Sequence, residues 1–255
     1  ITGKSAESLK VSVGSKKETQ IILVYSACGG VGKTTVALGI SACLTKNYKP
    51  DLYINAGRLQ SFQRMLENKS SITASDVYAK LANPSENAYN DVKHVIRQEL
   101  FSYLPPFKTS LLSLGLSYSL YGRLAESAKK SNEYDFIVID AEASFNEDVA
   151  KLIDIADKVI VVTKQTMNSV YATNVLVSNI NGSGSDKYSF ICNDFDKGAD
   201  NALISPEIAL KFNVTEYIEH MEHFDGLKCG ELSNSSGIQK REYDEQFRKV
   251  QKCVC

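Results

Sequence analysis

The stretch SACGGVGKTT, at residues 26–35, combines residue types that phosphate chemistry requires. Its three glycines allow main-chain N–H groups to converge on phosphate oxygens without obstruction by side chains. Lys33 would pair with the β- and γ-phosphates of a nucleotide, and the hydroxyl of Thr34 would bind Mg²⁺. Because an apolar run precedes the stretch and a helical pattern follows it, we interpret it as a nucleotide-binding loop rather than an incidental glycine-rich turn.

A magnesium ion bound to a nucleotide needs a further protein ligand, normally a carboxylate at the end of a buried strand. The run FIVID ends at Asp140 and supplies one. An aspartate at a strand end is common, but in combination with the loop it predicts a metal site formed by Thr34 and Asp140. Lys33 and Asp140 are the predicted catalytic pair.

These residues need a scaffold that brings the ends of two strands together. Apolar, β-branched runs that are typical of buried parallel strands recur along the chain. Helix-length segments lie between them, including 33–46 and 169–180. The alternation predicts an α/β fold with a doubly wound, mostly parallel sheet flanked by helices on both faces. The expected strands are 20–26, 51–55, 101–104, 134–140, 158–163 and 188–193.

Two further segments have apolar patterns. Residues 71–130 are mostly helical in pattern, and within them the apolar run 111–124 could serve either as core or as a protein-docking surface. Residues 238–252 have the pattern of a final helix with a thin apolar face. The thin face and the acidic residues favour docking of this helix on the core over binding to a bilayer. The expected apolar face consists of Tyr243, Phe247 and Val250.

The runs GGVGKTT, YDFIVID and ADKVIVVT together resemble the deviant Walker A P-loop ATPases typified by MinD and ParA. Within that group, YINAGRLQSFQ and SYLPPF are similar to the pilus assembly ATPases TadZ and CpaE. The resemblance extends over residues 20–193. It implies the cofactors ATP and Mg, a nucleotide-dependent homodimer, and pilus or secretion assembly proteins as partners. It also implies that residues 1–19 are a linker from a preceding receiver-like domain, and that residues 20–255 form the P-loop ATPase domain.

The chain departs from the family pattern at positions that serve hydrolysis. Cys28 stands where the family has a signature lysine, and a thiol cannot replace an ammonium as a point charge. Asn55 and Gly57 match two family aspartates, and DAEAS after Asp140 lacks the family's proline-containing stretch. Loss of a cationic stabiliser slows phosphoryl transfer by ~10³-fold or more, whereas ground-state binding persists. We therefore expect ATP binding with weak hydrolysis.

Recognition of the base is predicted from the same resemblance. Asn193, at the end of YSFICN, matches the family's adenine-reading asparagine, although a strand-end asparagine can also simply cap a turn. The run NDFD has a faint likeness to the Asn-Lys-x-Asp element of GTPases, but Asp194 replaces the lysine, so we favour ATP over GTP. The predicted nucleotide-binding set is Cys28, Gly29, Gly30, Val31, Gly32, Lys33, Thr34, Thr35 and Asn193.

Composition limits the partners. The 29 Lys and Arg residues nearly balance the 30 Asp and Glu residues, so there is no strong nucleic-acid signal. No apolar run approaches the ~18 residues of a transmembrane segment. Six scattered cysteines favour a reducing compartment. These features predict a cytoplasmic protein. The resemblance to TadZ and CpaE further implies recruitment by partners to a cell pole or the inner membrane face.

The sequence therefore predicts an ATP-binding, Mg-dependent dimerising switch that localises or assembles Flp-type pilus or secretion machinery. One alternative is a competent ParA/MinD-like ATPase in DNA partitioning or division-site placement, and another is a scaffold that no longer binds nucleotide. His220 and His223 are three residues apart and could share a metal if they lay on a helix, but a solvated helix face is the favoured reading. The terminal CVC is read as an inert tail rather than a prenylation or metal site.

Overall fold

The computed structural model describes residues 18–47, 51–221 and 238–254. Several sequence-based predictions fall outside these residues: most of the linker (1–17), His223 and the last residue of the CVC tail.

An eight-stranded sheet forms the centre of the described structure, with the order β3-β4-β2-β5-β1-β6-β7-β8. Neighbouring strands are parallel, apart from the antiparallel pair of β3 and β4 at one edge. The strands are β1 (Gln20–Tyr25), β2 (Leu52–Ala56), β3 (Arg97–Gln98), β4 (Ser102–Tyr103), β5 (Phe136–Ala141), β6 (Lys158–Thr163), β7 (Tyr188–Phe195) and β8 (Val214–Glu219).

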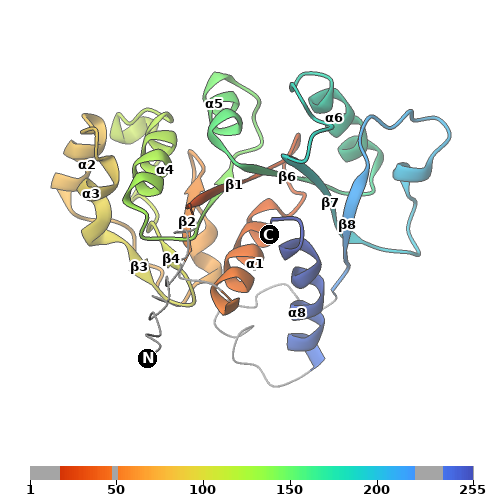
Figure 1. Cartoon of the computed structure of the whole chain (residues 1–255), viewed down its shortest axis with the longest axis horizontal. Coiled ribbons are helices and arrows are strands. Elements are labelled where there is room, and N and C mark those ends of the chain that lie inside the picture. Colours follow the sequence, from red (N-terminus) through yellow and green to blue (C-terminus); the bar gives the residue numbers. More distant parts are fainter. Residues whose placement is uncertain (1–17, 48–50, 222–237, 255) are drawn as a thin grey trace, which may run out of the picture.

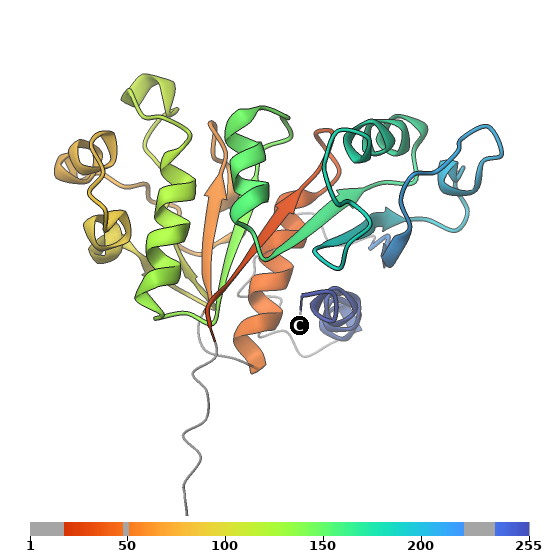
Figure 2. The ribbon, with the colours of Figure 1, turned by 45° about the horizontal axis from the view of Figure 1, so that its top comes forward.

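Helices cover both faces of this sheet, as the sequence predicts (Figure 1). Helices α1 and α8 lie on one face, whereas α4, α5 and α6 lie on the other, an arrangement that is also clear in the turned view of Figure 2. The helices are α1 (Lys33–Asn47), α2 (Ser75–Ala82), α3 (Ala88–Val92), α4 (Leu120–Ser131), α5 (Glu147–Ile155), α6 (Met167–Val177) and α8 (Ile238–Gln251). Single 3₁₀ turns are η1 (Phe62–Met65), η2 (Lys93–Val95), η3 (Leu112–Leu114) and η4 (Ala202–Ile204).

The continuous apolar runs of the central strands explain the two cores. Side chains alternate across a strand, so Ile21 and Leu23 of β1 enter the core beneath α4, α5 and α6, whereas Ile22 and Val24 enter the core shared with α1 and α8. All four side chains are buried. A strand that is apolar on both faces is stable only when helices cover both faces, which is what the doubly wound arrangement provides.

Helix α1 is buried on its outer side as well as against the sheet. Phe247 and Val250 of α8 are fully buried against it. A Cβ at Gly39 would lie 2.2 Å from the Phe247 ring, so the glycine allows the two helices to approach closely. The final helix thus docks on the core, as predicted from its apolar face; the Tyr243 side chain lies outside the described residues.

The predicted organisation differs from the structure in two places. Residues 71–130 are only partly helical, because they also form β3, β4 and extended segments at the sheet edge. Strand β8 was missed, since VTEYIE at the other edge mixes polar and apolar residues without a clear period and is only partly buried. Within 111–124, most apolar side chains are buried in the core, although Leu112 is 89% exposed. Within the described residues, no helix has the length and apolar character that a membrane crossing demands.

Candidate functional site: a cleft at the carboxyl ends of the central strands

The glycine-rich loop joins the end of β1 to the start of α1. Gly32 has a φ of +85°, a left-handed conformation that disfavours other residues, and a Cβ there would lie 2.2 Å from Nδ2 of Asn193. That amide donates to the carbonyl of Val31 over 2.9 Å. Asn193 therefore braces the loop from the end of β7. At Gly29 and Gly30, an added Cβ would meet no atom within 4 Å, so this side of the loop is open.

Asp140 accepts three hydrogen bonds at the end of β5. The Thr34 hydroxyl and the Asn55 amide each donate to Oδ2 over 2.7 Å, and the Tyr53 hydroxyl donates over 3.0 Å. Strand register explains the convergence, because Asn55 of β2 and Val24 of β1 are the neighbours of Asp140 on its two sides. Tyr53 lies two residues before Asn55 on β2, so the two side chains point to the same face of the sheet.

Burial and neighbouring charges have opposite effects on the pKa values of Asp140 and Lys33. Burial raises the pKa of Asp140, while its donors and the charge of Lys33 act to lower it. Burial lowers the pKa of Lys33, and the charge of Asp140 opposes that shift. A hydroxyl and a carboxylate at hydrogen-bond distance are hard oxygen donors of the kind that Mg²⁺ prefers. The pair of Thr34 and Asp140 therefore fits a magnesium ion that is shared with a phosphate.

A cleft of about 540 Å³ opens above the loop and the first turn of α1. Its size lies in the range of small-molecule sites. Helix α1 is 15 residues long, and its N-terminal N–H groups have no partner inside the helix, which favours an anion there. The lining residues come from the loop, η1 and the ends of three strands: Gly30, Gly32, Lys33, Thr34, Thr35, Arg64, Lys164, Asn193, Asp194, Glu219, His220 and Met221.

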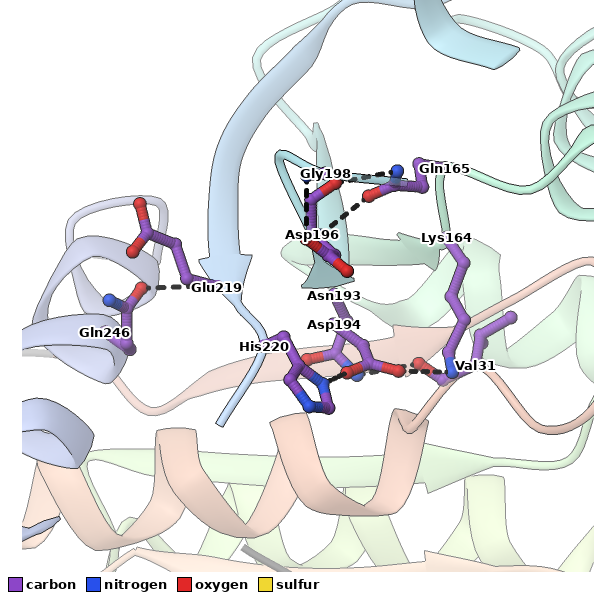
Figure 3. Close-up of polar contacts among 10 residues, drawn as sticks. All are labelled: Val31, Lys164, Gln165, Asn193, Asp194, Asp196, Gly198, Glu219, His220 and Gln246. Atoms are coloured by element: carbon purple, nitrogen blue, oxygen red, sulfur yellow. Dashed lines mark hydrogen bonds and ion pairs between the residues drawn. The ribbon is translucent and has the colours of Figure 1, made fainter. Parts of the chain in front are cut away.

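A charged cluster also lines the cleft (Figure 3). Asp194 accepts from Lys164 over 2.7 Å and lies 2.6 Å from Nδ1 of His220. The cluster therefore links the ends of β6, β7 and β8. Burial acts to raise the pKa of Asp194, but the hydrogen bonds and charges of Lys164 and His220 outweigh it and leave the pKa lowered. Asp194 has a φ of +59°, unusual for a residue other than glycine, and the β7–β8 pairing is irregular between Cys192 and Phe195.

The sequence also singled out Cys28, Val31, Thr35 and Gly57. Thr35 lines the cleft, whereas Val31 is 2% exposed and contributes through its carbonyl. Cys28 is half-buried, and its Sγ lies 3.6 Å from the Ser169 hydroxyl at the start of α6. Gly57 lies beside Asn55, where an added Cβ would be 3.0 Å from the amide oxygen. An amide and a glycine thus occupy the positions where the family resemblance implies carboxylates.

Sequence reasoning missed Tyr53, Lys164 and Arg64. Tyr53 could have been found from its spacing of two from Asn55 on a strand. The helix proposed for the two histidines is wrong at His220, which follows strand β8 in a non-helical conformation. No cluster of three or more His, Cys, Asp or Glu residues suited to a metal occurs in the described residues. The likeness of NDFD to the GTPase element does not extend to its last residue, Asp196. Asp196 does not line the cleft, and its side chain accepts a hydrogen bond from the main-chain N–H of Gly198.

Comparison with known proteins identifies the family. A family model described as an AAA domain, AAA_31, matches residues 19–187. The chain belongs to this AAA-domain family. The match spans the glycine-rich loop and Asp140 and ends just before β7.

Solved structures extend the likeness of this AAA-domain chain to its whole fold. A ParA family ATPase from Chlorobium tepidum has a TM-score of 0.72 and 14% identity, over 94% of this chain and 99% of that one. MinD of Pyrococcus horikoshii, complexed with Mg-ADP, has a TM-score of 0.69 and 20% identity, over 92% of this chain and 96% of that one. The fold is therefore that of the MinD/ParA P-loop ATPases, as the sequence predicts.

Two curated relatives match part of the AAA-domain chain. An uncharacterized ATP-binding protein of Methanocaldococcus jannaschii is 29% identical over 153 residues, which are 59% of this chain and 55% of that protein. A putative septum site-determining protein MinD of Emiliania huxleyi is 27% identical over 178 residues, 69% of this chain and 63% of that protein. The matched regions thus cover less than two thirds of either relative.

Proposed function

We propose that this chain is a nucleotide-gated switch that binds Mg-ATP in the cleft, dimerises in response and hydrolyses ATP slowly. The observation that carries the proposal is the 2.7 Å contact between Thr34 and Asp140 at the base of an open glycine-rich loop. Lys33 and the N-terminus of α1 would hold the phosphates, and Thr34 with Asp140 would hold Mg²⁺. The bound Mg²⁺ would supply charge neutralisation of the phosphates. The complex of Pyrococcus horikoshii MinD with Mg-ADP supports this assignment.

Slow hydrolysis follows from the groups that line the cleft. Among the described residues, the carboxylates that line it are Asp194 and Glu219. Both are engaged in ion pairs, Asp194 with Lys164 and Glu219 with Lys197. Asn55 offers an amide that is already donated to Asp140. The described residues would therefore lack a group that orients the attacking water and a cation at position 28, whereas binding needs neither.

For the output, we infer protein docking at a pilus or secretion assembly site, with recruitment to a cell pole or the inner membrane face. This inference rests on the resemblance of YINAGRLQSFQ and SYLPPF to TadZ and CpaE. The complex of MinC with MinD from Aquifex aeolicus provides a precedent for a protein partner on this fold. ATP-dependent capture of a purified pilus assembly component would support this output, and capture that is equal with and without ATP would contradict a gated one.

The switch is tested by sedimentation with and without Mg-ATP. The wild-type chain should retain Mg-ATP in equilibrium dialysis and shift to a dimer, and Lys33→Ala should lose both properties because it removes the phosphate-pairing charge. Lys80→Ala, at an exposed position on α2, is the control and should behave as wild type. Dimerisation of Lys33→Ala at the wild-type ATP concentration would refute the switch.

A second function is a competent ParA/MinD-like ATPase in DNA partitioning or division-site placement, which the fold equally accommodates. Robust ATP turnover would favour it. Partitioning additionally requires ATP-dependent DNA binding that weakens steeply with salt, because phosphate contacts release counterions. Filter binding at two salt concentrations separates the two functions. Absence of any retained nucleotide at millimolar Mg²⁺ would instead leave only a scaffold role.

A further inference from the structure

Within the part of the chain that the structure describes, Arg64 is a cation of the cleft for which no neutralising partner is observed. Lys33, Arg64 and Lys164 line the cleft. Lys164 is paired with Asp194, and Lys33 interacts with the charge of Asp140. Among the described residues, the Arg64 side chain forms no ion pair and no hydrogen bond, and both lining carboxylates are paired elsewhere. A positive charge in this setting favours an anionic ligand.

The position of Arg64 is set by the turn that carries it. Phe62 and Met65, on either side of it in η1, are 2% and 6% exposed, whereas Arg64 itself is exposed. The Phe62 ring packs against Tyr53 and Tyr103, with centroid distances of 5.3 and 6.4 Å. Aromatic pairs of this kind hold a backbone segment in place.

The same packing links the turn to the metal carboxylate. Tyr53, which contacts Phe62, donates its hydroxyl to Asp140 over 3.0 Å. Arg64 therefore belongs to a packed unit that also contains Asp140, the residue bonded to Thr34 at the start of α1. These contacts connect the turn that carries Arg64 to the start of α1, although Arg64 and Thr34 are 30 positions apart in the chain.

We propose that Arg64 is a phosphate-contacting residue, which supplies the second positive charge on the polyphosphate of the bound nucleotide. The inference rests on the proposed nucleotide binding and adds a residue to it. A guanidinium donates to non-bridging phosphate oxygens through a planar fork, and such charge-assisted bonds are about twice as strong as neutral ones. Lys33 contacts the phosphates from the start of α1, and Arg64 does so from η1.

The contact between Arg64 and the phosphates acts mainly on Mg-ATP affinity. Its charge and its planar geometry predict different losses in different variants. Arg64→Gln removes the charge but keeps a polar side chain, so Mg-ATP affinity should fall by about tenfold or more. Arg64→Lys keeps the charge without the fork and should lose less. Because the cleft mouth is open to solvent, the ratio of dissociation constants between Arg64→Gln and wild type should shrink at high salt.

The experiment is calorimetric titration of Mg-ATP into wild type, Arg64→Gln, Arg64→Lys and the control Arg123→Gln, at about 50 and 500 mM salt. Arg123 is exposed on α4, which covers the opposite face of the sheet, so its variant should match wild type. Thermal melts check that each variant is folded.

The outcomes separate the two levels of the proposal. If wild type fails to bind Mg-ATP, the proposed function itself fails. If wild type binds and Arg64→Gln binds equally well, nucleotide binding stands and the role of Arg64 is refuted. Equal losses in Arg64→Gln and Arg64→Lys that do not change with salt would also refute it, because they would indicate a structural effect rather than a charge. A salt-sensitive loss that Lys partly restores supports the contact.

Discussion

Asp140 shows how single residues combine in this site. One carboxylate oxygen accepts from a threonine, a tyrosine and an asparagine, and each donor comes from a strand or helix next to β5. Hydrogen bonds to the charged form partly offset the cost of burial, although the pKa of Asp140 stays raised. Replacement of one donor by a second carboxylate would put two negative charges side by side, so Asn55 stabilises the site in its present form. Because Asn55 stands where the family resemblance implies an aspartate, this position also lacks a carboxylate that could orient water.

Asp51 provides a pH-dependence at the residue scale that is independent of the cleft. It lies fully buried just before β2, and burial raises its pKa to about 7, although the Thr45 hydroxyl donates to it and opposes the shift. Because the folded state holds this proton more tightly than the unfolded state, the free energy of unfolding should fall as pH rises from about 4 to about 7. The loss from this residue should be on the order of 4 kcal/mol at most.

Urea denaturation at several pH values checks this prediction. Asp51→Asn should flatten the decline between pH 4 and 7, because the amide does not titrate in this range. Asp200→Asn, at an exposed position, is the control and should keep the wild-type slope. If Asp51→Asn and wild type lose stability in parallel, the pKa of Asp51 is not raised in the folded protein.

At the scale of elements, α1 connects the cleft to the rest of the molecule. Its first turn carries Lys33 and Thr34, and its middle is packed between the sheet and α8. The helix has little amphipathic character because both its inner and outer sides are covered. The prediction from Val36, Ile40, Cys43 and Leu44 of one buried face is confirmed for those residues, but Ala37 and Leu38 are buried as well. The start of α1 is therefore held by packing that extends far from the loop.

The contact between Gly39 and Phe247 can be measured as a coupling between the two helices. Phe247→Ala should destabilise the protein by about 3–5 kcal/mol through the cavity it leaves. Gly39→Ala should cost about 1–3 kcal/mol in wild type, because the new Cβ collides with the ring, and much less in the Phe247→Ala background. Denaturant titration of the four proteins gives the coupling energy.

The exposed neighbour Arg248 is the control for this cycle, and Arg248→Ala should change stability by less than about 0.5 kcal/mol. Costs for Gly39→Ala that are the same with and without the Phe247 ring would show that α8 does not pack on α1 in this way.

At the scale of the whole molecule, the sheet order assembles the cleft from distant parts of the chain. Strands β5, β1, β6, β7 and β8 are adjacent in space, and their carboxyl ends meet at one edge. Ligands of open α/β sheets bind at this edge because the connecting loops there diverge. Nucleotide binding would therefore stabilise the entire sheet rather than one loop.

Mg-ATP should accordingly raise the free energy of unfolding by about 2.7 kcal/mol when it is present at 100 times its dissociation constant. Chelation of Mg²⁺ should remove much of this increase, since Thr34 and Asp140 then lose their ligand. Thermal or urea denaturation with ATP, with and without a chelator, checks the prediction. Asp140→Asn should make ATP stabilisation insensitive to the chelator. Stabilisation by ATP that is identical with and without Mg²⁺ in wild type would contradict a metal at this position.

The glycine-rich loop, the strand-end position of Asp140 and the fold class could all be predicted from the amino-acid sequence, because they depend on local spacing and on the apolar periodicity of each segment. The six strands of the inner sheet and the helices after the loop could be predicted for the same reason. The edge strand β8 could not, since half-exposed strands at an edge have a mixed pattern. Within residues 71–130, β4 matches the predicted strand 101–104, whereas β3 was missed because it is two residues long and pairs with β4 at the sheet edge.

Which side chains contact one another depends on the tertiary structure. The sheet order is not the chain order, so the pairing of Asn55 with Asp140 depends on a register between strands whose paired residues are 85 positions apart in the chain. The cluster of Asp194 with Lys164 and His220, and the place of Arg64 at the cleft, arise in the same way. Such contacts form through long-range packing of strand ends and buried rings, and no local pattern in the chain encodes them.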